Sequence, residues 1–251
     1  MLYIFDCDGV LVDSEIIASQ VDSELLGEIG YEITPEEVSH RFAGLTTRAI
    51  GEIVEQEIGR DLPEDFFART KAEIDRRLAN ELLPVAGAHD LLDMLDGPRC
   101  VCSNSSMHRL QLSMEKTKLW DRFRPYIFSA VEVGDKTPKP SPNVFRHAME
   151  QFAVEPRQAV VLEDSTFGVA AAKAAGARVV GFTGGKHTWK MHADVLTEAG
   201  AETVINRLVD FPATAAALMA VSAPLDDAFE LSRIDASKLG RVAKAWEGLP
   251  E

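Results

Sequence analysis

The run LYIF at residues 2–5, followed by DCDG at residues 6–9, decides how this chain begins to fold. Four apolar residues rich in aromatic and β-branched side chains predict a short buried strand. The aspartates and the glycine then favour a turn, so we expect the strand to end at Asp6. Because Asp6 and Asp8 lie two positions apart, their side chains share a face on an extended backbone. The chain is therefore predicted to begin with a strand that carries two carboxylates at its carboxyl end.

The next part of the chain, residues 14–83, carries helical patterns. Apolar residues recur with helical spacing around residues 16–29, 47–58 and 64–82. We interpret Gly30, Pro35, Gly44 and residues 59–63 as breaks between helices. No convincing strand pattern interrupts this part, so we expect a helical insert.

From Pro84 onward, strand and helix patterns alternate. Strands are predicted at 99–102, 126–128, 159–162, 178–182 and 203–205, and helices at 88–95, 107–117, 143–152, 166–175 and 191–199. Alternating strands and helices imply right-handed crossovers and a parallel sheet. The fold class is therefore α/β, a Rossmann-like parallel sheet with a helical insertion, followed by an alanine-rich, helix-prone tail.

Composition narrows the function classes. The 251 residues carry 26 Lys and Arg against 40 Asp and Glu, a net charge of −14 that disfavours binding to nucleic acid or an anionic membrane. No apolar run approaches the roughly 18 residues of a spanning helix, and the start of the chain does not resemble a signal peptide. The three cysteines, Cys7, Cys100 and Cys102, favour reduced thiols, core packing for the latter two, and a cytoplasmic location.

Polar residues follow several predicted strands and should meet at one edge of the sheet, where open α/β sheets bind ligands. Glu163 and Asp164 follow the strand at 159–162, and their oxygen ligands suit Mg²⁺ better than zinc. The turn Ser103-Asn104-Ser105 follows the strand at 99–102 and can offer N–H and hydroxyl donors to an anion. Lys139, between two prolines, can neutralise a phosphate and a nearby carboxylate, and Lys136 is the weaker candidate. Together these groups predict Mg²⁺-assisted chemistry on a phosphate.

Each group also has a structural interpretation. Asp6 and Asp8 can simply end a strand, and Glu163, Asp164, Ser105 or Ser106 can cap the following helix. For Ser165 we favour a cap over a catalytic role. Lys139 can be a solvated loop residue, and we take His187 and His192 as loop residues rather than ligands. The segment at residues 184–187 is not a phosphate-binding P-loop, because Val180 and His187 depart from that pattern.

Four segments in this order closely resemble the motifs of the haloacid dehalogenase superfamily, in its β-phosphoglucomutase-like phosphatase branch. They are DCDGVLVDS at 6–14, VCSN at 101–104, KPSPNVF at 139–145 and VLEDSTFG at 161–168. The resemblance covers about residues 1–210. It implies a Mg²⁺-dependent phosphatase that acts on a small phosphomonoester, for which a sugar or related metabolite phosphate is expected.

The resemblance also implies a role for each matching residue. Asp6 corresponds to the nucleophile that accepts the phosphoryl group, and Asp8 to the general acid and base. Ser103, Asn104 and Lys139 would hold the phosphate. The Mg²⁺ ion would be held by Asp6, the Asp8 backbone carbonyl and Asp164, with Glu163 near the ion or its waters.

The family's fold implies a core domain of residues 1–14 and 84–215, a helical cap of 15–83, and a tail of 216–251 without an assigned role. Cap residues set specificity in this family, and the matching turn here contains Gly44 and Arg48. Arg48 can contact an anionic or hydroxyl-rich substrate. We expect a small phosphorylated metabolite as partner, no nucleic acid or membrane, and a monomer or homodimer.

Three other functions deserve comparison. A hexose-phosphate mutase would carry a histidine where this chain has Ala18 and a lysine where it has Ala43, so both positions favour hydrolysis. The founding dehalogenase chemistry needs neither a second aspartate nor a metal, which argues against it. A signalling module that only stores an aspartyl-phosphate would not need Asp8 or so large a helical insert.

Overall fold

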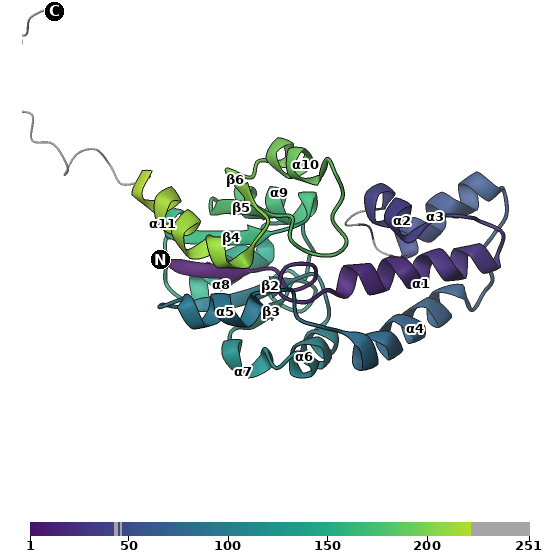
Figure 1. Ribbon diagram of the computed structural model, residues 1–251, viewed down its shortest axis with the longest axis horizontal. Coiled ribbons are helices and arrows are strands. Elements are labelled where there is room, and N and C mark those ends of the chain that lie inside the picture. The colour runs from purple at the N-terminus through teal and green to yellow at the C-terminus, as the bar shows by residue number, and fades with distance from the viewer. Residues whose placement is uncertain (43–44, 46, 222–251) are drawn as a thin grey trace, which may run out of the picture.

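The sheet of this protein has six parallel strands in the order β3-β2-β1-β4-β5-β6 (Figure 1). The structure is a computed structural model that describes residues 1–42, 45 and 47–221. The strands are β1 (Leu2–Phe5), β2 (Arg99–Ser103), β3 (Ile127–Ser129), β4 (Ala159–Glu163), β5 (Arg178–Phe182) and β6 (Thr203–Ile205). The predicted α/β class and parallel sheet are confirmed. β1 lies inside the sheet, between β2 and β4, and both of these neighbours come from later in the chain.

Helices cover both faces of the sheet. One face packs against α5 (Ala88–Met94), α6 (Met107–Lys116), α7 (Trp120–Phe123) and α11 (Phe211–Val221). The other packs against α8 (Asn143–Gln151), α9 (Thr166–Ala174) and α10 (His192–Ala199). Successive strand residues point to opposite faces. Phe5 accordingly belongs to the first core and Ile4 to the second.

Strand register brings the polar ends of β1, β2 and β4 together. Phe5 pairs with Val101 on one side and with Leu162 on the other. The Asp6 N–H donates to the Leu162 carbonyl at 3.0 Å, which continues the pairing for one residue beyond β1. Asp6 therefore lies beside Glu163, the last residue of β4.

The helical insert contains α1 (Ser14–Glu28), α2 (Pro35–Arg41), α3 (Thr47–Ile58) and α4 (Phe66–Glu81), and it extends beyond the carboxyl edge of the sheet (Figure 1). The chain enters and leaves it through adjacent segments. Asp13 donates its N–H to the Leu83 carbonyl, and Val85 donates its N–H to the Leu11 carbonyl, both at 3.0 Å. Two neighbouring segments therefore form the connection between the insert and the sheet.

The interpretation of Pro35 as a break was wrong, because Pro35 is the first residue of α2. Thr34 caps this helix by accepting from the Glu37 N–H, and the Glu37 carboxylate accepts from the Thr34 N–H. Proline suits the first turn, where its missing N–H has no helical partner in any case. The pattern Thr34-x-x-Glu37 is the sequence signature of this cap.

Four short elements were not predicted: α2, α7 and the 3₁₀ turns Pro156–Gln158 and Leu208–Asp210. The helix-prone start of the tail is confirmed by α11, whereas residues 222–251 lie outside the described residues, as does Gly44. None of the described helices is long and apolar enough to span a membrane. All three cysteines are buried and free, and Cys100 and Cys102 pack in the same core, as predicted.

Candidate active site

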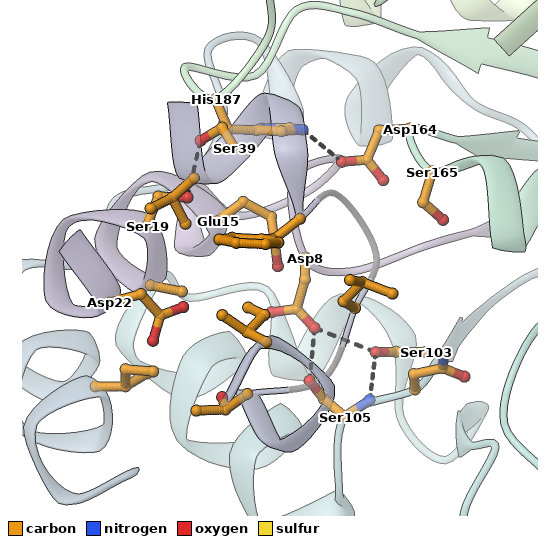
Figure 2. A pocket seen from close by; sticks show the side chains of 18 of the residues that line it. Asp8, Glu15, Ser19, Asp22, Ser39, Ser103, Ser105, Asp164, Ser165 and His187 are labelled. Atoms are coloured by element: carbon orange, nitrogen blue, oxygen red, sulfur yellow. Dashed lines mark hydrogen bonds and ion pairs between the residues drawn. The ribbon is translucent and has the colours of Figure 1, made fainter. Parts of the chain in front are cut away.

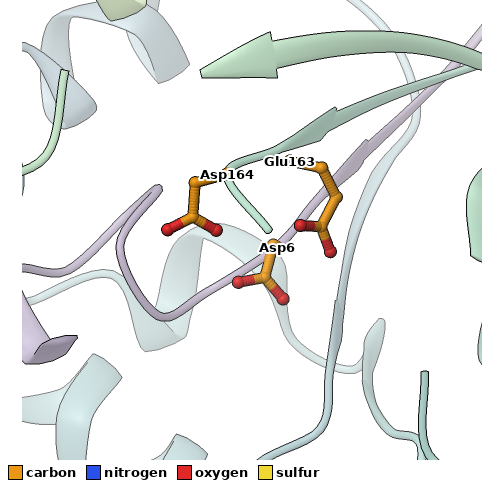
Figure 3. Close-up of side chains that lie close together, drawn as sticks. All are labelled: Asp6, Glu163 and Asp164. Atoms are coloured by element: carbon orange, nitrogen blue, oxygen red, sulfur yellow. The ribbon is translucent and has the colours of Figure 1, made fainter. Parts of the chain in front are cut away.

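Three buried carboxylates converge at the carboxyl edge of the sheet (Figure 3). Asp6 follows β1, Glu163 ends β4 and Asp164 follows it. Each offers an oxygen that lies within 4.8 Å of the others. Burial raises the pKa of Asp6 well above its usual range, with Lys139 opposing the rise and the neighbouring carboxylates adding to it. The edge of the sheet therefore concentrates negative charge that needs a cation.

Lys139 supplies part of the positive charge that these carboxylates need, from inside the protein. Its Nζ donates to Asp6 Oδ1 at 2.5 Å, to Glu163 Oε1 at 2.6 Å and to the Cys102 carbonyl at 2.7 Å. Burial disfavours the ammonium, but contacts with Asp6 and Glu163 outweigh burial and raise the pKa of Lys139. The structural alternative of a solvated loop lysine is therefore wrong for Lys139, whereas Lys136 is exposed.

Asn104 holds the backbone of Lys139 in place. The Lys139 N–H donates to Asn104 Oδ1 at 2.7 Å, and Asn104 Nδ2 donates to the Lys139 carbonyl at 3.3 Å. This pair joins the turn after β2 to the loop before α8. The Asn104 side chain therefore positions Lys139. Binding of an anion by the Asn104 backbone stays a prediction.

Asp8 does not belong to the three-carboxylate cluster and is held by hydroxyl groups, two of which, from Ser103 and Ser105, are drawn in Figure 2. Ser14 donates to Asp8 Oδ1 at 2.6 Å, while Ser105 and Ser103 donate to Oδ2 at 2.7 and 3.2 Å. Ser105 is therefore not the helix cap. Ser106 caps α6 and Ser165 caps α9, so the structural interpretation is confirmed for these two serines.

Gly9 makes the turn between the aspartates and the insert possible. Its φ of +81° is in the region that favours glycine, and a Cβ at this position would lie 1.9 Å from Asp164 Oδ2. The first turn of the chain can therefore approach the end of β4 only because residue 9 has no side chain.

Two histidines that the sequence analysis took as loop residues contact Asp164. His187 Nε2 lies 2.9 Å from Asp164 Oδ2, and this contact outweighs burial to raise the pKa of His187. His192 Nε2 lies 2.7 Å from the Asp164 carbonyl, and burial lowers the pKa of His192. Their position after β5, at the same sheet edge as the aspartates, was the signal that could have identified them.

These groups line a cavity of about 770 Å³ between the sheet edge and the insert (Figure 2). From the insert, α1 contributes Glu15 and Asp22, which the sequence analysis missed. Arg48 also lines the cavity, but its side chain is exposed and lies 3.6 Å from Glu52. Ring contact between His40 and Trp189, and a 3.1 Å ion pair between Arg109 and Asp75, join the insert to the core around this cavity.

The donor set of the cluster fits a hard divalent cation. Every group in it is a carboxylate oxygen, and Mg²⁺ prefers oxygen ligands while retaining room for water and substrate phosphate. No sulfur or imidazole ligand belongs to the set among the described residues, which argues against a zinc site.

Comparison with known proteins assigns the family. The model of the haloacid dehalogenase-like hydrolases matches residues 3–182. The 6-phosphogluconate phosphatase of Escherichia coli is 34% identical over 184 residues, covering 73% of this chain and 82% of that protein. The fructose-1-phosphate phosphatase of the same organism is 28% identical over 175 residues, covering 69% and 91%.

Solved structures agree in fold. A conserved haloacid dehalogenase-like protein of unknown function from Agrobacterium tumefaciens is 49% identical, with a TM-score of 0.83 and coverage of 86% of this chain and 98% of that one. A family hydrolase from Deinococcus radiodurans with bound phosphate and sodium is 29% identical, with a TM-score of 0.74 and coverage of 86% and 95%. With the site geometry, these matches show that the chain is an enzyme of the haloacid dehalogenase-like hydrolase family.

Proposed function

We propose that this enzyme is a Mg²⁺-dependent phosphatase that hydrolyses a small phosphorylated metabolite through an aspartyl-phosphate on Asp6. One observation carries the proposal: Lys139 binds Asp6 and Glu163 together, and Asp164 completes a cluster of carboxylate oxygens within 4.8 Å. A nucleophile, a fixed cation and a set of metal ligands thus meet at one sheet edge, as phosphoryl transfer requires.

Each residue has a role that follows from its contacts. Asp6 attacks phosphorus with a carboxylate oxygen, and the ammonium of Lys139 favours the ionised form of that carboxylate against the rise in its pKa that burial causes. The phosphate would lie against Ser103, the Asn104 backbone and Lys139. Asp8 protonates the leaving alcohol and then removes a proton from the water that hydrolyses the aspartyl-phosphate. The three hydroxyl donors fix the Asp8 carboxyl in one orientation for both steps.

Asp6, the Asp8 backbone carbonyl and Asp164 would hold Mg²⁺, with Glu163 near the ion or its waters. When bound, Mg²⁺ would neutralise the clustered carboxylates and stabilise negative charge on the phosphoryl oxygens. His187 orients Asp164 from the other side through its 2.9 Å contact.

The relatives support a sugar phosphate or a related metabolite phosphate as substrate. The names of two of them specify 6-phosphogluconate and fructose 1-phosphate. Ala18 lines the cavity where the mutases carry histidine, which favours hydrolysis over isomerisation. The division into a core and a cap of residues 15–83, the role of Arg48 in specificity, the cytoplasmic location and the monomeric or homodimeric state stay predictions.

The test is phosphate release from a panel of phosphomonoesters, measured for the wild type and for Asp6→Asn with Mg²⁺ and with chelator. We expect release that needs both Mg²⁺ and Asp6, because an amide is a poor nucleophile. Loss of activity in Asp6→Asn should be at least 1,000-fold, in line with removal of a covalent nucleophile.

The exposed Asp61→Asn variant is the control, since it makes the same chemical change away from the cluster. Circular dichroism of each variant shows whether the fold is retained. A folded Asp6→Asn variant with near wild-type release would overturn the proposal. Isomerised products without free phosphate would identify a mutase, and stable phosphoaspartate without release would identify a signalling module.

A further inference from the structure

Helix α1 presents a polar stripe to the cavity that the proposed phosphate chemistry does not use. Glu15, Ala18, Ser19 and Asp22 all line the cavity, and their spacing of three, four and seven residues places them on one helix face. Figure 2 shows the Glu15 and Asp22 carboxylates on the same side of the cavity as Asp8. The stripe runs from the reacting groups into the insert.

The two ends of this stripe differ from its middle in their hydrogen bonding. Ser19 is paired with Ser39 of α2 at 2.8 Å. Asp22 is only 6% exposed, yet within the described part of the chain no hydrogen bond reaches its carboxylate. The Glu15 carboxylate is half-buried and likewise receives no hydrogen bond from the described residues, although the nearby Ser14 hydroxyl donates to Asp8. A buried carboxylate such as that of Asp22 normally has such partners, so Asp22, and Glu15 beside it on the same helix face, are acceptors available to a ligand.

Nearby cations do not supply the missing hydrogen bonds. Arg109 is close enough to favour the ionised form of Asp22, but its guanidinium pairs with Asp75 of α4 at 3.1 Å. Burial raises the pKa of Asp22 to about 6 and that of Glu15 to about 7, which is the expected cost of desolvation without compensating donors. Folding thus keeps two poorly solvated acceptors facing the cavity.

We propose that Asp22, together with Glu15, accepts hydrogen bonds from hydroxyl groups on the alcohol part of the substrate, so that the enzyme selects polyhydroxylated phosphomonoesters. This inference rests on the proposed phosphatase function, and it assigns specificity to α1 in addition to Arg48. An unpaired buried acceptor discriminates strongly, since a substrate without the matching hydroxyl leaves it unpaired in the complex.

The positions of the two acceptors along α1 add a length requirement. Seven residues at 1.5 Å each place Asp22 about 10 Å along the helix axis from Glu15. Glu15 follows Ser14, which binds Asp8, so Glu15 lies nearer the leaving oxygen. Asp22 therefore selects for hydroxyls on the far end of a leaving group of several carbons, whereas short leaving groups reach only Glu15.

The experiment measures kcat/KM for a hexitol 6-phosphate and for n-hexyl phosphate, which has the same chain length without the hydroxyls. The full chain is assayed with Mg²⁺ as wild type, Asp22→Asn and Asp22→Ala. We expect the ratio of the two kcat/KM values to fall in that order, by about 10-fold or more for alanine, because a hydrogen bond to a charged group is lost. Most of the change should be in KM for the hexitol phosphate.

Asp61→Ala, an exposed change in the same insert, is the control and should keep the wild-type ratio. A three-carbon glycerol phosphate gives a second check, because its kcat/KM should be less sensitive to residue 22 than that of the hexitol phosphate. An unchanged ratio in folded Asp22→Ala, or no wild-type preference for the hexitol phosphate, would overturn this inference while leaving the phosphatase function intact. If the wild type released phosphate neither from these substrates nor from the wider panel of phosphomonoesters, the proposed function itself would fail.

Discussion

At the scale of single residues, Lys139 connects stability to chemistry. Its ammonium binds Asp6 and Glu163, two carboxylates that folding removes from water. A buried ion pair contributes little compared with apolar packing, but removing one partner leaves an uncompensated charge. The lysine is therefore needed by the folded state even before any substrate binds.

The variant Lys139→Met tests this dependence. We expect the free energy of unfolding to fall by about 3–5 kcal/mol at pH 8. Burial already raises the pKa of Asp6 and Glu163, and loss of the ammonium raises both further. Because the folded state then binds more protons than the unfolded state, its stability decreases as pH rises, so the deficit should shrink between pH 8 and pH 5.

Urea denaturation at the two pH values measures the deficit. Lys136→Met is the matched control, as Lys136 is an exposed residue of the same loop. A deficit that is equal at pH 5 and pH 8 would contradict the assignment of the loss to the two carboxylates.

Asp22 should have the opposite effect to Lys139: removing its charge should stabilise the folded protein. Burial raises its pKa from 3.8 to about 6, with Arg109 opposing the rise, so the folded state binds the proton more tightly than the unfolded state. The sign follows directly: stability is greatest below pH 3.8 for this group and decreases as pH rises through about 6. Asp22→Asn removes the ionisation. We therefore expect the free energy of unfolding of this variant to exceed that of the wild type by up to about 3 kcal/mol at pH 8.

Urea denaturation of Asp22→Asn and wild type between pH 5 and pH 8 measures this difference. The advantage of the variant should increase with pH over that range. If the variant were less stable at pH 8, Asp22 would have a stabilising partner and the inference about free acceptors would weaken as well.

At the scale of elements, α9 depends on the absence of a side chain at Gly168. A Cβ there would lie 1.8 Å from Glu163 Oε1, so the first turn of α9 can cover the end of β4 only with glycine. The Ser165 cap fixes that turn, since its hydroxyl accepts from the Gly168 N–H at 3.0 Å. Gly168 therefore matters for close packing rather than for a special φ.

Gly168→Ala and Gly27→Ala should consequently shift stability in opposite directions. In α9 the new methyl group must displace Glu163 and its contact with Lys139, so we expect a loss of roughly 1–3 kcal/mol and reduced phosphate release. In α1 nothing lies within 4 Å of the added Cβ, so alanine should raise the free energy of unfolding by up to about 1 kcal/mol. Thermal and urea denaturation measure both, and a stabilised Gly168→Ala would contradict the packing argument.

Most elements were predictable because local pattern and tertiary position agree. The run at residues 2–5 is apolar throughout and is buried on both faces in β1. Alternation of strands with helices from Pro84 gave the parallel sheet, and parallel strands bring their carboxyl ends to one edge. That edge is why the convergence of Asp6, Glu163, Asp164 and Lys139 could be predicted before any coordinates.

The prediction that failed and the site residues that were missed depend on tertiary context. Pro35 was taken as a break because proline ends a helix interior, although at a first turn it begins one. Glu15 and Asp22 carry no motif, and only the packing of α1 over the sheet edge reveals that they face a cavity. His187 lies in the loop after β5 and His192 begins α10; their place beyond a strand end was a usable signal, but residue spacing alone does not show that both contact Asp164.

At the scale of the whole molecule, the cluster at the sheet edge should make stability depend on Mg²⁺. A ligand that binds the folded state alone stabilises it by about 2.7 kcal/mol at a concentration of 100 times Kd. We expect the melting temperature to rise when Mg²⁺ is added and to fall back to its Mg²⁺-free value when a chelator is added. Asp164→Asn should show a much smaller rise, because one carboxylate of the cluster is lost.

Differential scanning fluorimetry over a Mg²⁺ titration measures the shift, with NaCl of equal ionic strength as the control for screening. An equal rise in the wild type and in Asp164→Asn would show that Mg²⁺ acts elsewhere on this acidic surface.

The central position of β1 also has a consequence for synthesis of the chain. Leu2 pairs with Ala159 and Tyr3 with Arg99, so β1 leaves the ribosome before either of its neighbours in the sheet. The helices of the insert are complete by residue 81, long before β4 is made. Domains generally fold as units during translation, and distant strand pairings are slow to form. A nascent chain thus can pack its insert first, and only after residue 163 emerges can Asp6 acquire the neighbours of the proposed active centre.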